Sequence, residues 1–63
     1  MSDLPAQDRV LYECRLVLAS DCRIVRVREA TPEQAIATVG ATYPGWTVLT
    51  VHQWAGEGWV PAA

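Results

Sequence analysis

The sequence predicts an α+β fold: one small β-β-α-β domain in which a three-stranded sheet, in the order 2-1-3, packs one helix on one face. Three observations predict it. Two strand-like segments, 12–19 and 22–29, are separated by only two residues, Ser20 and Asp21. A helix-start signal follows at residues 31–34, and a third strand-like run spans residues 46–54. A right-handed crossover sets the third strand parallel to the second, so we expect it to pair antiparallel with the first.

Length and composition indicate one globular domain. A chain of 63 residues buries only about 60% of its unfolded surface, so its stability is marginal. We expect a flexible lead-in at 1–9, the β-β-α-β domain at 10–54 and a C-terminal tail at 55–63. No run reaches the roughly 18 apolar residues that a membrane span needs, and residues 1–9 lack an apolar signal core. A cytoplasmic protein without membrane contact is therefore expected.

The first two strands are expected to form an antiparallel hairpin. The register that collects most apolar side chains on one face also puts Glu13 opposite Arg28, a favourable cross-strand pair. It sets Arg15 against Arg26, which is unfavourable unless an anionic or aromatic group lies between them. The expected partners are Tyr12 with Glu29, Glu13 with Arg28, Cys14 with Val27, Arg15 with Arg26, Leu16 with Val25, Val17 with Ile24 and Leu18 with Arg23.

The helix is expected to begin at Pro32. Thr31 can accept a hydrogen bond from a free amide of the first turn, proline suits the first helical position, and Gln34 completes a capping box. A helically spaced apolar stripe should pack on the sheet, and residues 44–45, proline and glycine, should end the helix. The stripe consists of Ala35, Ile36, Val39 and Tyr43.

The third strand is apolar on both of its alternating sides. With a period of two, one side holds Trp46, Val48, Thr50, His52 and Trp54, and the other holds Thr47, Leu49, Val51 and Gln53. One helix covers only one face of a small sheet, so one side should meet a partner, a second copy or the C-terminal tail. We expect the side with Leu49 and Val51 to face the helix, and the reverse assignment stays open at this point.

A predicted binding face remains outside this core. Tryptophan and arginine dominate binding hot spots, and large exposed apolar patches on small proteins mark interaction sites. With Glu13 beside them, the predicted binding residues are Arg15, Val17, Ile24, Arg26, Arg28, Trp46, Val48, Thr50, His52 and Trp54.

No catalytic or metal site is predicted. Cys14 and Cys22 point to opposite faces in the expected register, so neither a disulfide nor a shared metal is expected. His52 is the sole histidine, and no nucleophile can be assigned to it. Phosphate-binding glycine motifs, the serine-hydrolase elbow and paired metal-binding histidines are absent from the sequence. We therefore expect a protein that is not an enzyme and binds no cofactor.

Two functional hypotheses follow. The first is a small protein-binding or self-associating module, such as an acidic inhibitor or accessory protein, that uses the predicted binding face or the uncharged third strand at 47–53. An edge strand without charge or proline predicts a homodimer. The alternative is a single-stranded nucleic-acid binder, with tryptophan stacking on bases and arginine contacting phosphates. The net charge of −2 and the absence of lysine favour the first.

Overall fold

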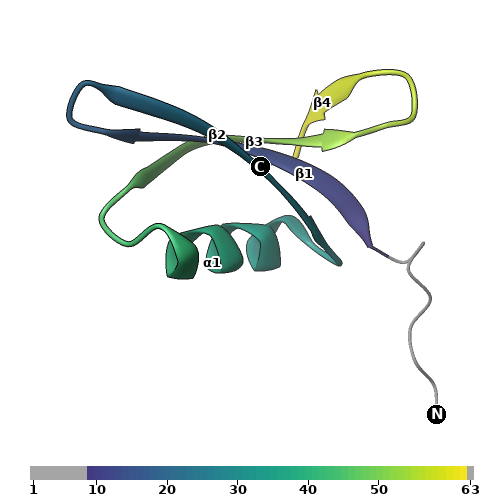
Figure 1. The fold of residues 1–63 in the computed structure, drawn as a ribbon. Helices are drawn as coiled ribbons and strands as arrows, with labels where there is room; N and C mark the ends of the chain where they lie inside the picture. Colours follow the sequence, from purple (N-terminus) through teal and green to yellow (C-terminus); the bar gives the residue numbers. More distant parts are fainter. Residues whose placement is uncertain (1–8, 63) are drawn as a thin grey trace, which may run out of the picture.

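The protein is one antiparallel sheet with a single helix against one face (Figure 1), as seen in a computed structural model that describes residues 9–62. The strand order is β2-β1-β3-β4. The α+β class and the central position of the first strand are thereby confirmed, whereas the expected three-stranded sheet is wrong, because a fourth strand is present. Residues 1–8 of the expected lead-in lie outside the described residues. The elements are β1 (Val10–Leu18), β2 (Asp21–Glu29), α1 (Pro32–Thr42), β3 (Thr47–Trp54) and β4 (Trp59–Pro61).

The fourth strand forms within the segment expected to be a tail. Gly56 has a φ of +90°, a left-handed conformation that glycine adopts without steric cost, and the Ala55 N–H donates to the Gly58 carbonyl oxygen at 2.9 Å. This turn sends the chain back along β3, where Trp54 pairs with Trp59. The edge of β3, expected to be free over 47–53, is therefore covered at residues 52–54.

The β1–β2 hairpin is shifted by two residues from the expected register. Leu18 pairs with Asp21 across the two-residue connection Ala19–Ser20, where Ala19 has a φ of +55°. A shift of two preserves which side chains share a face but changes every partner. The observed pairs are Val10 with Glu29, Leu11 with Arg28, Tyr12 with Val27, Glu13 with Arg26, Cys14 with Val25, Arg15 with Ile24, Leu16 with Arg23 and Val17 with Cys22. The expected clash of Arg15 with Arg26 is thus avoided.

A β-bulge divides β3 into two halves. Arg15 pairs with Thr50, whereas the next residue, Leu16, pairs with Val48, so Leu49 is an extra residue on β3. Compared with strict alternation, one extra residue moves every side chain that precedes it along the strand to the opposite face of the sheet. This bulge explains why the sequence of β3 is apolar on both alternating sides.

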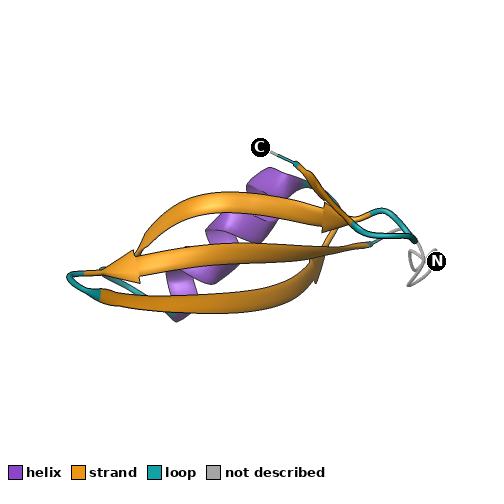
Figure 2. Cartoon of the chain, turned by 90° about the horizontal axis from the view of Figure 1, so that it is seen from above, coloured by secondary structure: helices purple, strands orange, loops and turns teal. Residues whose placement is uncertain are grey.

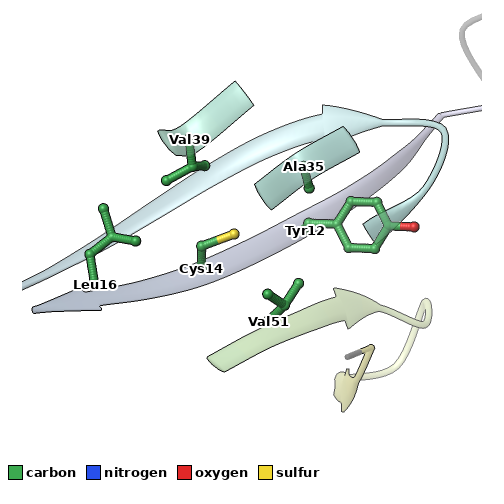
Figure 3. Close-up of a cluster of buried hydrophobic side chains, with 6 residues drawn as sticks. All are labelled: Tyr12, Cys14, Leu16, Ala35, Val39 and Val51. Atoms are coloured by element: carbon green, nitrogen blue, oxygen red, sulfur yellow. The ribbon is translucent and has the colours of Figure 1, made fainter. Parts of the chain in front are cut away.

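The core lies between α1 and the central strands (Figure 3). Cys14 and Leu16 from β1 and Val39 from α1 are the largest fully buried side chains. A core this small gives limited hydrophobic stabilisation, as expected for the chain length. Its buried members are Tyr12, Cys14, Leu16, Ala35, Val39 and Val51.

The helix begins as the sequence predicts. The Gln34 N–H donates to Thr31 Oγ1 at 3.1 Å, and Pro32 is the first helical residue. Figure 2 shows α1 crossing behind the strands, on one side of the sheet only. With 11 residues it is too short to cross a bilayer, and no helix in the described part of the chain could do so.

Candidate binding surface

The face of the sheet opposite α1 is not covered by the helix, and we call it the open face. Figure 1 shows α1 on one side of the sheet and the β3–β4 hairpin rising on the other. Strand alternation and the observed pairs assign its side chains, because residues directly opposite one another share a face. The open face consists of Leu11, Glu13, Arg15 and Val17 from β1, Cys22, Ile24, Arg26 and Arg28 from β2, Thr47, Thr50, His52 and Trp54 from β3, and Trp59 and Pro61 from β4.

Two residues of the predicted binding face are not on the open face. Trp46 and Val48 lie on the helix side and pack against the core, because the bulge at Leu49 reverses the first half of β3. The prediction that Trp46 and Val48 belong to the binding face is therefore wrong. The open face does hold the others: Arg15, Val17, Ile24, Arg26, Arg28, Thr50, His52 and Trp54.

The end of the core near Trp46 is closed by an arginine. Arg23 projects to the helix side of β2, and its guanidinium carbon lies 5.3 Å from the centroid of the Tyr43 ring and 5.7 Å from that of Trp46. Such cation–π contacts contribute about 0.5–1 kcal/mol each at exposed sites. Arg23 therefore packs on the fold and is not a member of the open face.

Trp59 adds an aromatic side chain that was not among the predicted binding residues. Its ring meets that of Trp54 edge-on, with centroids 5.3 Å apart and planes at 65°. The Arg26 guanidinium carbon lies 5.1 Å from the Trp59 centroid. The turn-forming residues 56–58 between Trp54 and Trp59 are the sequence signal that could have predicted this hairpin.

One ion pair lies in the middle of the open face. The Nη2 of Arg26 is 3.0 Å from Glu13 Oε2, and the Nε of Arg26 donates to the same oxygen at 3.1 Å. Arg15 and Arg28 make no ion pair within the described residues. Three arginines and one glutamate give the open face a formal charge of +2, opposite in sign to the −2 of the whole chain.

Comparison with known proteins adds no functional information. No protein family, curated protein or solved structure matches this chain.

The polar and thiol groups of residues 9–62 do not assemble a chemical site. No group of three or more His, Cys, Asp or Glu side chains in this range could hold a metal ion, and no pocket is present there. Cys14 is buried on the helix side and Cys22 is exposed on the open face, which confirms their predicted separation. Burial raises the pKa of the Cys14 thiol, which makes it a poorer nucleophile.

Proposed function

We propose that this protein is a non-catalytic protein-binding module and that the open face is its binding surface. The observation that supports this most directly is Ile24, which is 55% exposed in the middle of β2, on the face that the helix does not cover. Trp54, 43% exposed, lies on the same face. Exposed apolar side chains beside arginine and tryptophan are typical of protein-binding hot spots.

Nucleic-acid binding is the less favoured alternative. The formal charge of +2 and the exposed Trp54 ring support it. Against it, Glu13 puts a carboxylate at the centre of the face, and Arg26 is already bound to that carboxylate and packed on Trp59. Ile24 and Val17 offer aliphatic contacts, which suit protein side chains better than bases.

Of the two surfaces considered for the predicted homodimer, the edge of the third strand is the better supported. Two open faces in contact would bring like charges together, which is unfavourable. The outer edge of β3 is paired with β4 at residues 52–54, and the Ala62 N–H donates to the Val51 carbonyl oxygen at 2.9 Å, which leaves the uncharged stretch 47–50 beyond that pairing. Leu49 lies in this stretch and is 54% exposed. We propose that any self-association occurs through this edge and leaves the open face accessible.

The test of the proposed function is capture of a partner by matched surface variants. Immobilised wild-type protein should retain a protein partner from an extract of the source cells, and Ile24→Ser should lose it. Leu18→Ser is the control, because Leu18 is 43% exposed but lies outside the open face. Equal retention by wild type and both variants would show that the open face is not the binding surface.

A further inference from the structure

We infer that the open face binds an extended acidic segment of a partner protein, with two carboxylates four residues apart and an uncharged residue midway between them. This inference rests on the proposed function and names the chemistry of the partner. It is carried by the positions of Arg15, Arg28 and the ion pair that lies between them.

The two arginines of the open face that make no ion pair in the described residues, Arg15 and Arg28, lie at opposite corners of a small rectangle of side chains. Arg15 is directly across from Ile24, and Arg28 is directly across from Leu11. Along β2, Arg28 is four residues from Ile24, the partner of Arg15. With about 3.3 Å per residue and about 4.8 Å between strands, the two Cα atoms are roughly 14 Å apart.

An extended segment presents alternate side chains to the same side. Residues i and i+4 of such a segment are about 13 Å apart, which matches the separation of the two arginines. A guanidinium binds a carboxylate with two parallel hydrogen bonds, so each arginine can take one carboxylate. The aliphatic corners, Leu11 and Ile24, lie beside the path and can contact the stems of the acidic side chains.

The residue of the partner segment that lies over the centre of the rectangle must be neutral. Glu13 and Arg26 form an ion pair there, with Arg26 Nη2 3.0 Å from Glu13 Oε2. A third carboxylate at the midpoint would be repelled by Glu13 and would find the Arg26 guanidinium already occupied. A nucleic-acid strand carries a negative charge at every residue and cannot leave the midpoint neutral, so a peptide fits this pattern better.

A second copy of this chain does not supply such a segment. The one pair of acidic residues four apart in the whole sequence is Glu29 and Glu33. Glu33 belongs to the first turn of α1 and is therefore not extended. The occupant is thus a different protein.

The test uses a synthetic peptide containing Glu-Thr-Val-Thr-Glu, blocked at both ends and fluorescently labelled, titrated with the full chain at low salt. We expect saturable binding that is lost when both glutamates are replaced by glutamine and weakened when their spacing is cut to three. Arg15→Gln and Arg28→Gln should each weaken binding about fivefold, as for exposed ion pairs. Their effects should multiply in the double variant, because the two sites are far apart. Arg23→Gln, on the helix side, is the control and should bind normally.

A charge swap separates binding from folding. The double variant Arg15→Glu, Arg28→Glu should lose the acidic peptide and gain a peptide in which both glutamates are lysine. Equal binding of the glutamate and glutamine peptides, or an equal loss in Arg23→Gln, would overturn the inference. Saturable binding of a single-stranded oligonucleotide that needs Arg15 and Arg28 would overturn it in favour of nucleic acid. If the acidic peptide fails while partner capture still depends on Ile24, the inference is wrong and the proposed function stands.

Discussion

Arg26 lies over the indole ring of Trp59, with its guanidinium carbon 5.1 Å from the ring centroid, although β2 and β4 are the two outermost strands of the sheet. The contact spans the open face because the β3–β4 hairpin rises on that side (Figure 1). The Arg26 side chain thus connects β2, at one edge of the sheet, with β4 at the other.

This contact should be measurable as an energetic coupling. In a double-mutant cycle with Arg26→Gln and Trp59→Leu, we expect a coupling of about 0.5–1 kcal/mol in the free energy of unfolding, the usual strength of an exposed cation–π pair. Urea denaturation supplies the four values. The same cycle with Arg28→Gln is the control and should give no coupling.

The helix cap should be stabilising. Replacing Thr31 by alanine removes the oxygen that accepts the Gln34 N–H, and we expect a loss of about 1 kcal/mol in the free energy of unfolding. Thr42→Ala is a matched control at the other end of α1, where the hydroxyl bonds to the Thr38 carbonyl and caps no free amide. Equal losses in the two variants would argue against the cap.

The bulge should tolerate removal of its extra residue. Deleting Leu49 leaves Val48 opposite Leu16 and Thr50 opposite Arg15, so both faces keep their side chains. We expect the deletion variant to fold, with an unchanged circular dichroism spectrum. Deleting Thr47 instead should move Trp46 off the core and cause unfolding at lower urea. Loss of structure in the first variant alone would contradict this account of β3.

Sedimentation equilibrium of surface variants can determine through which surface the predicted homodimer forms. If two copies join through the uncovered edge of β3, Leu49→Lys should give a monomer, because a lysine on an edge strand opposes strand pairing. Ile24→Lys should leave the dimer intact, because Ile24 lies on the open face. A wild-type protein that is monomeric at high micromolar concentration would contradict self-association.

The two cysteines should differ in reactivity. Iodoacetamide at pH 8 should modify the exposed Cys22 and leave the buried Cys14 unmodified until the protein unfolds. Burial raises the pKa of Cys14 in the folded state, so the protonated thiol favours folding. This contribution to the free energy of unfolding is fully present at pH values below the pKa that Cys14 has in the unfolded chain. It is lost as the pH rises through the folded pKa. Mass spectrometry of the native protein checks the first expectation, and denaturation at alkaline pH checks the second.

Sequence patterns predicted which side chains share a face more reliably than which residues pair. The alternation of β1 and β2 separates Cys14 from Cys22 correctly, yet it is equally compatible with registers two residues apart. The register depends on the tight turn at Ala19, which has a positive φ. An alanine in the sequence does not predict such a conformation. The Thr31 cap was predictable because its chemistry is local.

The other features of the candidate surface come from a bulge, a short strand and a contact between distant residues, all of which leave weak signals in the sequence. The bulge falls at Leu49, an ordinary strand residue, so strict alternation placed Trp46 and Val48 on the wrong face. Strand β4 has three residues, too few for a period to be recognised. The contact of Trp59 with Arg26 joins residues 33 positions apart in the chain and could not be predicted from local pattern.

The bulge also decides which positions around it serve folding and which serve binding. Trp46 and Val48 before it and Val51 after it contribute to the core, whereas Thr50 and Trp54 lie on the open face. A library randomised at Thr50 and Trp54 alone could therefore explore new binding specificities while the core positions of the strand stay fixed. The same separation allows the open-face positions to drift in evolution without loss of the fold.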